Sequence, residues 1–252
     1  MLLRTRGEPL LWQTSPVTGI FAHRGLHTSV RENTLEAFAA ARDVGANGVE
    51  LDARRTARGE LVVHHDPRVQ SLVIAEHAAA DLAPYVPSLA AALAATTGLV
   101  VNVEVKNLLE LDEPTYDASG DFARSVVAAV DSSGRADDVI YSSFDLATCA
   151  VLAAASPRPV GWLFETTDDP RASLDAAARA GLAAVNPYVG LVNTEFVTLA
   201  HARGLAVNVW TVNAPADLAA MFDLGVDIVI TDDPVRAIAL RDGSTEATLR
   251  MS

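Results

Sequence analysis

The chain has 252 residues, of which half are apolar and a fifth are charged, and its formal net charge at pH 7 is −13. This length and apolar content allow one large core and exclude intrinsic disorder, so we expect residues 1–252 to form a single domain with a core from about 19 to 241. The acidic balance argues against a nucleic-acid partner, because such binding depends on Lys and Arg displacing counterions from phosphates. The single cysteine, Cys149, excludes an internal disulfide and favours a reducing compartment, for which we expect the cytoplasm.

Residues 1–16 contain a short apolar patch that charges and prolines interrupt. A secretory signal would need a longer apolar region and a small-residue cleavage site, so we read these residues as mature sequence. Further along, charged, glycine and polar residues interrupt the apolar stretches before they reach the length of a membrane span. We therefore expect neither a signal peptide nor a membrane span.

Short apolar and β-branched runs then recur along the chain and alternate with segments of helical periodicity. The predicted strands are residues 19–22, 48–51, 99–105, 139–142, 160–164, 184–186, 206–210 and 228–230. The predicted helices include residues 34–43, 89–96, 122–132, 146–155, 195–203 and 216–224. Strands that alternate with helices pair in parallel through right-handed crossovers, and eight such units indicate a closed (β/α)₈ TIM barrel.

Local signals refine these elements. Asn33 is followed three residues later by Glu36, which is the spacing of an N-terminal capping arrangement, and Gly204 and Gly225 stand where helices need a left-handed residue. Residues 55–61 read as a turn, and residues 61–64 read as a strand that follows too soon for a helical crossover. We therefore expect a small hairpin inserted after the second barrel strand.

Polar side chains gather where the predicted strands end, which in such barrels is the face that carries the chemistry. They are His23, Arg24, Glu50, Asp52, Glu104, Lys106, Ser143, Glu165 and Asp232.

Three of these residues, Glu50, Asp52 and Glu104, could bring their carboxylates together. Glu50 and Asp52 are two residues apart, so they project from the same face of an extended strand, and Glu104 stands in the same relation to Lys106. Burying three unpaired carboxylates would be costly unless a divalent cation neutralised them, and oxygen ligands favour Mg²⁺ or Ca²⁺ over zinc. The alternative is an internal salt-bridge network with Lys106 and Arg24.

His23 and His65 are the candidate acid and base, because imidazole titrates near neutrality and can both accept and donate a proton. Alone, each would more often be a packed or surface residue, but the nearby acid cluster favours catalysis. Strand alternation should turn His64 away from His65, and Asp66 could orient a ring through a hydrogen bond.

Other polar residues carry weaker signals. We expect a solvated face from the acidic run of Glu110, Asp112, Glu113, Asp117 and Asp121. We assign no function to His27, His77, His201 or Cys149. The strand-end residues Glu165, Tyr188 and Asp232 are expected either to shape the pocket or to satisfy backbone groups of neighbouring loops.

Seven short motifs follow one another between His23 and Pro234, in the order HRG, ENT, ELD, HHD, NVEVK, WTVN and TDDP. Together, in this order and spacing, they resemble the glycerophosphodiester phosphodiesterase family. The resemblance implies a divalent-metal enzyme that hydrolyses a glycerophosphodiester to glycerol 3-phosphate and an alcohol. It also implies roles for residues of the motifs: His23 and His65 as the acid and base, Glu50, Asp52 and Glu104 as metal ligands, Arg24 and Lys106 as partners of the phosphate, and Trp210 as a wall near the glycerol.

The sequence departs from this family after HHD, where a longer insertion is usual. Here the chain soon reaches the next helix, so we expect less cover over the site. Two rivals remain open. One is another phosphodiesterase of the same barrel type, either a lysophospholipase D acting on lysolipids or an enzyme like the phosphatidylinositol-specific phospholipases. The other is a non-catalytic barrel that binds phosphorylated ligands.

Overall fold

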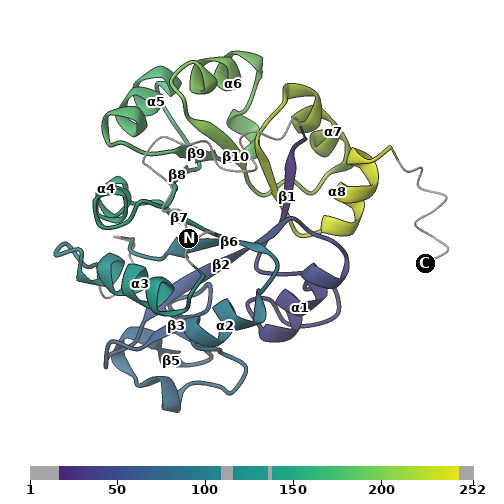
Figure 1. Cartoon of the computed structure of the whole chain (residues 1–252). Helices are drawn as coiled ribbons and strands as arrows, with labels where there is room; N and C mark the ends of the chain where they lie inside the picture. The colour runs from purple at the N-terminus through teal and green to yellow at the C-terminus, as the bar shows by residue number, and fades with distance from the viewer. Residues whose placement is uncertain (1–16, 109–115, 136–137, 244–252) are drawn as a thin grey trace.

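Eight parallel strands close into a barrel in the computed structural model, which describes residues 17–108, 116–135 and 138–243. The barrel strands are β1 (Gly19–Ala22), β2 (Gly48–Arg55), β6 (Val100–Val105), β7 (Val139–Ser143), β8 (Val160–Phe164), β9 (Ala184–Pro187), β10 (Ala206–Val209) and β11 (Ile228–Thr231). The ring is closed because β1 pairs in parallel with both β11 and β2. Figure 1 shows β1, at the start of the chain, beside the last helices. The predicted (β/α)₈ barrel is confirmed.

Eight α-helices lie outside the ring within the described residues (Figure 1). They are α1 (Leu35–Asp43), α2 (Leu89–Ala95), α3 (Asp121–Ser132), α4 (Leu146–Ala155), α5 (Pro170–Arg179), α6 (Thr194–His201), α7 (Pro215–Leu224) and α8 (Pro234–Arg241). Two of them, α5 and α8, were not among the named predicted helices. Both begin with proline after a capping aspartate, Asp169 or Asp233, which satisfies backbone N–H groups of the first turn. No helix in the described part of the chain is long and apolar enough to cross a membrane.

Alternate residues of the strands face two different cores, as the period of two along a strand requires. On β1, Ile20 packs into the large core between strands and helices, whereas Phe21 belongs to a separate cluster with Ile140, Ile228 and Ile230. This second cluster lies in the interior of the barrel, and Trp210 packs against it. Buried polar side chains, among them Asn186 and Asn208, share this interior with the apolar cluster.

The predicted hairpin is also confirmed. Strand β2 continues past the barrel to Arg55 and pairs there in antiparallel fashion with β3 (Leu61–Val63). The chain then forms the short strands β4 (Arg68–Val69) and β5 (Leu72–Val73) and the single 3₁₀ turns η1 (Ile74–Glu76) and η2 (Ala79–Asp81). This insertion has a small core of its own, made of Val62, Val69, Ile74 and Leu82.

The structure corrects one predicted cap. Thr34, not Asn33, is the N-cap of α1, and its side chain accepts a hydrogen bond from the N–H of Ala37. Asn33 instead has a left-handed backbone, with φ of 55°, and its side chain points to Asp52. Gly204 and Gly225 do have the expected positive φ, and Gly225 is the C-cap of α7.

Several sequence expectations lie outside the described residues. They concern residues 1–16 and the acidic side chains Glu110, Asp112 and Glu113. Within the described part, Asp117 accepts hydrogen bonds from the N–H groups of Ser119 and Phe122, so it stabilises the segment that leads into the first turn of α3.

Candidate active site

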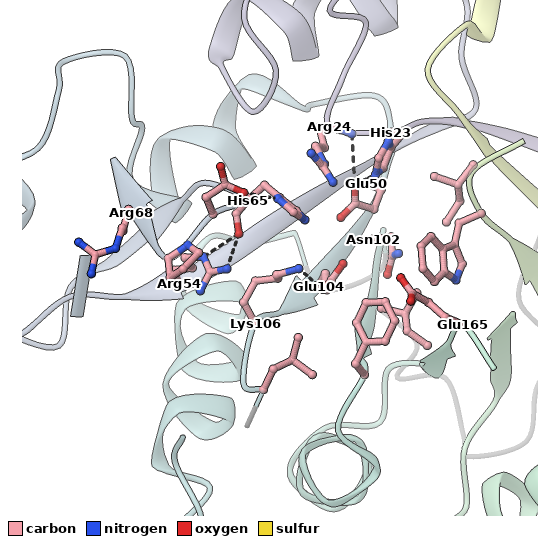
Figure 2. A pocket seen from close by; sticks show the side chains of 17 residues that line it. His23, Arg24, Glu50, Arg54, His65, Arg68, Asn102, Glu104, Lys106 and Glu165 are labelled. Atoms are coloured by element: carbon pink, nitrogen blue, oxygen red, sulfur yellow. Dashed lines mark hydrogen bonds and ion pairs between the residues drawn. The ribbon is translucent and has the colours of Figure 1, made fainter. Parts of the chain in front are cut away.

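A pocket of about 830 Å³ lies at the carboxyl ends of the barrel strands. Seven of the eight residues predicted for the site line it, and the eighth, Asp52, contacts these residues from a buried position. The lining residues are His23, Arg24, Glu50, Arg54, His65, Asp66, Pro67, Arg68, Asn102, Glu104, Lys106, Leu108, Phe144, Leu163, Glu165, Trp210 and Ile230. Figure 2 shows Glu50, Asn102 and Glu104 near its centre, with Arg68 at one margin and Glu165 on the opposite side.

The register of two neighbouring strands brings the three predicted metal ligands together. Strand β2 pairs in parallel with β6 so that Glu50 lies opposite Asn102 and Asp52 lies opposite Glu104. All three carboxylates are buried, and one oxygen of each lies within 4.8 Å of the others. The acid cluster predicted from the two-residue spacing is therefore a real feature of the fold.

Part of this cluster is neutralised by cationic side chains. Nζ of Lys106 lies 2.8 Å from Oε1 of Glu104 and 3.6 Å from Oδ1 of Asp52, and Nε of Arg24 lies 3.5 Å from Oδ2 of Asp52. Although burial raises the pKa of Asp52, the charges of Lys106, Arg24 and His65 outweigh it and hold that pKa well below its ordinary value. Arg24 is shared with Glu32, at 3.0 Å. In these contacts two cationic side chains serve three carboxylates, and Glu50 adds a fourth acidic group beside them, so the acidic groups outnumber their cationic partners.

Glu50 is the acidic side chain of the cluster with the fewest compensating contacts. Its Oε2 accepts a hydrogen bond from the backbone N–H of Arg24 at 3.1 Å, while its buried Oε1 has no hydrogen-bond partner among the described residues. Burial, followed by repulsion from Asp52 and Glu104, raises the pKa of Glu50 well above its ordinary value. A buried oxygen without a partner is costly, so this atom is where a bound cation would stabilise the site most.

The loop after β1 contacts two carboxylates of the acid cluster, Glu50 and Asp52. Arg24 and Asn33 both have left-handed backbones, and the N–H of Asn33 donates to the carbonyl of Arg24 at 2.9 Å. Nδ2 of Asn33 then donates to Oδ2 of Asp52 at 2.8 Å. Gly25 at the base of this loop has φ of 82°, and a Cβ there would lie 2.7 Å from the backbone of Ala37. The loop therefore fits tightly between β2 and α1.

His23 stands between the acid cluster and a second group of polar residues. Its Nδ1 lies 2.7 Å from Oδ1 of Asp232, and its Nε2 lies 4.0 Å from Oε2 of Glu50. Nδ2 of Asn213 donates to the other oxygen of Asp232 at 2.6 Å. Burial raises the pKa of Asp232, but its hydrogen bond and charge interaction with His23 dominate, and the pKa lies well below its ordinary value. Nε2 of His27 also reaches Oδ1 of Asp232, at 3.3 Å.

His65 is held in a similar way on the far side of the pocket. Its Nδ1 lies 2.7 Å from Oδ1 of Asp66, as expected for a residue that orients the ring. The guanidinium of Arg54 donates to the backbone carbonyl of His65, with Nε at 2.8 Å, and to that of His64 at 3.2 Å. His64 is not among the residues that line the pocket, which agrees with the predicted alternation.

Aromatic side chains form one wall. The ring of Trp210 meets that of Phe144 edge to face with centroids 5.2 Å apart, and its Nε1 donates to the carbonyl of Asn186 at 2.7 Å. Tyr188 packs against the same indole at 5.9 Å but does not line the pocket, whereas Glu165 lines it from an exposed position. Ser143 is buried, and its hydroxyl donates to the carbonyl of Val105, which is a structural contact.

Sequence reasoning missed several residues that shape this site. Asn33 lies inside the ENT motif, where only a capping role was predicted for it, and Asn102 lies inside NVEVK, of which only Glu104 and Lys106 were assigned to the site. Asn102 is buried, lines the pocket, and has an Oδ1 without a hydrogen-bond partner among the described residues. The contact of His27 with Asp232 joins residues 205 positions apart, so no local pattern could reveal it.

The chain is similar to known proteins over most of its length. The sequence model described as the glycerophosphoryl diester phosphodiesterase family matches residues 23–236. A glycerophosphodiester phosphodiesterase of Caldanaerobacter subterraneus subsp. tengcongensis is 28% identical over 246 residues, which cover 88% of this chain and 97% of that protein. Crystal structures similar in fold include a glycerophosphodiester phosphodiesterase from Parabacteroides distasonis, with a TM-score of 0.80, 24% identity, and 90% and 97% of the two chains covered. A phosphodiesterase of Oleispira antarctica, solved in complex with the product sn-glycerol-3-phosphate, has a TM-score of 0.76, 19% identity, and coverage of 90% and 97%.

Proposed function

Because the chain belongs to the glycerophosphoryl diester phosphodiesterase family, and is therefore a phosphoric diester hydrolase, we propose that it cleaves glycerophosphodiesters to glycerol 3-phosphate and an alcohol with a divalent cation. The observation that carries the proposal is the meeting of two histidines and three buried carboxylates at one pocket. This combination can hold a cation, bind a phosphodiester and move protons on both sides of the phosphorus.

Glu50, Asp52 and Glu104 are the proposed ligands. The donor set fits a cation, because three buried carboxylates share too few cationic partners and Oε1 of Glu50 has no hydrogen-bond partner among the described residues. Oxygen donors alone favour Mg²⁺ or Ca²⁺. When bound, such an ion polarises a phosphoryl oxygen and lowers the pKa of a coordinated hydroxyl.

The two histidines are supported as acid and base by the way they are held. In each, Nδ1 hydrogen-bonds to an aspartate, Asp232 for His23 and Asp66 for His65. A carboxylate partner holds a proton on Nδ1, so the lone pair of the neutral ring is on Nε2. Each Nε2 can then accept a proton from one group in the pocket or, once protonated, donate it to another.

Lys106 and Arg24 are proposed to bind the phosphate. Both line the pocket, both are held beside the carboxylates, and both keep a positive charge, because Glu104 and Asp52 outweigh the effect of burial and raise the pKa of Lys106. Trp210 and Phe144 would pack against the glycerol carbons.

We propose a two-step reaction in this pocket. A glycerol hydroxyl attacks phosphorus while one histidine takes its proton, and the other histidine protonates the departing alcohol as its bond to phosphorus breaks. Water then opens the resulting cyclic phosphate with the roles of the two histidines exchanged. The cyclic product should be trapped at short times; incorporation of solvent oxygen in a single inverting step would oppose this path.

Two rivals make different predictions. A lysophospholipase D should prefer lysolipids to water-soluble diesters, and a non-catalytic barrel should bind glycerol 3-phosphate without turnover. We favour the small diester because most of the lining residues are polar or charged, with Arg24, Arg54, Arg68 and Lys106 among them. We also propose a reducing compartment such as the cytoplasm, since Cys149 is free and buried.

The deciding experiment measures glycerol 3-phosphate released from glycerophosphocholine and glycerophosphoethanolamine. Protein stripped of metal with a chelator should be inactive, and Mg²⁺, Ca²⁺ or Mn²⁺ added separately should restore turnover. Turnover that persists in chelator would refute the dependence on a cation. No turnover of either diester with any of the three ions, alongside hydrolysis of a lysolipid, would replace the proposed substrate.

A further inference from the structure

We propose that His23, His27 and Asp232 form a second metal site, selective for Zn²⁺, and that zinc bound there switches off His23. The binding part depends only on the geometry, whereas the switch rests on the proposed function of His23 as an acid and base. The site is separate from the acid cluster in its residues and in the chemistry of its ligand atoms.

Three ligand atoms of the types that zinc prefers converge at this point. Nδ1 of His23 and Nε2 of His27 lie 2.7 Å and 3.3 Å from the same oxygen, Oδ1 of Asp232, and one possible ligand atom of each residue lies within 4.8 Å of those of the other two. Tetrahedral zinc with bonds of about 2.0 to 2.1 Å places its ligand atoms about 3.3 Å apart. The His27 to Asp232 distance already has this value, and a small outward rotation of the His23 ring would lengthen the His23 to Asp232 distance to match it. The third distance, between the two histidine rings, would be set by the same rotation.

The aspartate is also held as a ligand needs to be. Nδ2 of Asn213 donates to Oδ2 of Asp232 at 2.6 Å, and the N–H of Asp232 donates to Oδ1 of the same asparagine at 2.9 Å. These two contacts fix the carboxylate so that its Oδ1 faces both rings. Outer contacts of this kind orient the ligands of metal sites and support their affinity.

Access and charge favour the same conclusion. The side chains of His23, His27 and Asp232 are 17%, 24% and 37% exposed, so an ion can arrive from solvent and keep a water as its fourth ligand. Two imidazole nitrogens with one carboxylate suit zinc, whereas the three carboxylates of Glu50, Asp52 and Glu104 suit Mg²⁺ or Ca²⁺. The two sites should therefore fill with different ions in the same protein.

Occupation would remove the proton chemistry of His23. In the metal-free site the proton lies on Nδ1, shared with Asp232, and the lone pair on Nε2 is free to accept another. When zinc takes the place of that proton on Nδ1, the neutral ring must carry its remaining proton on Nε2. The ring then has no lone pair with which to act as a base, and it cannot gain a second proton to act as an acid.

Binding is tested on the whole protein with the acid cluster saturated by excess Mg²⁺. Competition with a chromogenic zinc chelator should reveal one zinc per chain, and His27→Asn should weaken that binding by at least about tenfold. His201→Gln is the matched control, because it removes a histidine that also pairs with an aspartate, Asp227 at 2.8 Å, but that shares this carboxylate with no second histidine among the described residues. Equal zinc affinity in wild type and His27→Asn, or zinc that excess Mg²⁺ displaces, would overturn the proposal.

The switch is tested by diester turnover in excess Mg²⁺, with each variant compared with its own zinc-free rate. Zinc should inhibit the wild type and His201→Gln alike, with His27→Asn at least about tenfold less sensitive. Inhibition that His27→Asn does not relieve would refute the switch. If no variant turns over any diester, the proposed function fails while zinc binding still tests the site. Turnover without zinc binding would refute only the site.

Discussion

Oδ1 of Asp232 lies 2.7 Å from Nδ1 of His23, and the two residues come from opposite ends of the chain that meet where β1 pairs with β11. Asp232→Asn keeps the shape of this contact but removes its charge, so the protonated form of His23 loses its partner. We expect kcat to fall by roughly tenfold or more while KM changes little, because proton transfer and not substrate binding is affected.

The neighbouring residue provides a control for this variant. Asp233 caps α8 by accepting a hydrogen bond from the N–H of Arg236. Asp233→Ala should lower the free energy of unfolding by about 1 kcal/mol and leave kcat unchanged. If Asp232→Asn instead raises KM and lowers stability with kcat intact, Asp232 has only a structural role.

His23→Ala and His65→Ala should each reduce turnover by about 10²-fold to 10⁴-fold, the usual contribution of a general acid or base. Both side chains are partly exposed at the pocket, so the melting temperature should change little. His77→Ala is a suitable control, because His77 lies in the insertion and contacts the carbonyl of Val73. Turnover near the wild-type rate in either His23→Ala or His65→Ala would refute the acid–base assignment.

Glu50→Gln should separate stability from cation binding. Without a cation, the raised pKa of Glu50 means that the folded chain holds a proton that the unfolded chain loses near the ordinary glutamate pKa of 4.5. This glutamate therefore destabilises the cation-free protein increasingly as pH rises from 4.5 through the higher folded pKa. Glutamine removes the effect, so the cation-free variant should melt at a higher temperature than the wild type at pH 7.

The same variant should bind Mg²⁺ or Ca²⁺ at least about tenfold more weakly, because a ligand charge is lost. In wild type, cation binding should release protons within that pH window and strengthen as pH rises, which calorimetry in two buffers can measure. Proton release that is the same in Glu50→Gln would show that another group titrates.

Asn33→Gly tests the hydrogen bond to Asp52 without disturbing the backbone. Asn33 has φ of 55°, which glycine adopts freely, while its amide donates to Asp52 at 2.8 Å. We expect weaker cation binding with nearly unchanged melting, whereas Asn33→Ala should also lose stability through backbone strain. Cation affinity equal to wild type in Asn33→Gly would show that the amide does not orient Asp52.

Gly161→Ala tests the packing inside the barrel. A Cβ at Gly161 would lie 2.2 Å from Oδ1 of Asn186, so the buried side chain of Asn186 or its surroundings must shift. We expect urea unfolding to report a loss of about 1 to 3 kcal/mol, as for other overpacked cores. The double variant with Asn186→Ala should recover part of this loss; the absence of any recovery would place the strain elsewhere.

Much of the fold was predictable because strand and helix signals are local. The eight strands were found within a few residues, and the two-residue spacing of Glu50 and Asp52 placed their carboxylates on one face. The acid cluster and the position of His23 follow from strand period and topology, whereas His65, which follows the predicted hairpin strand, was a candidate because of the acid–base chemistry of imidazole.

What the sequence could not predict depends on contacts made across the barrel. The pairing of Asp232 with His23 and His27 depends on the closure of β1 on β11. The side chain of Asn33 reaches Asp52 because Asn33 has a left-handed backbone, whereas its spacing from Glu36 predicted a helix cap. The end of β2 was also placed too early, because its last residues pair with β3 outside the barrel.

Because β2 extends to Arg55, this one strand positions both part of the acid cluster and the backbone of His65. Glu50, Asp52 and Arg54 alternate along it, and Arg54 donates to the backbone carbonyl of His65, so two of the three proposed cation ligands and one histidine depend on the register of a single strand. A one-residue slip of β2 would turn all three side chains to the opposite face at once. Insertions and deletions should thus be tolerated in the turn at residues 56–60, where the chain can vary in length, but not within β2, where the site is either complete or lost.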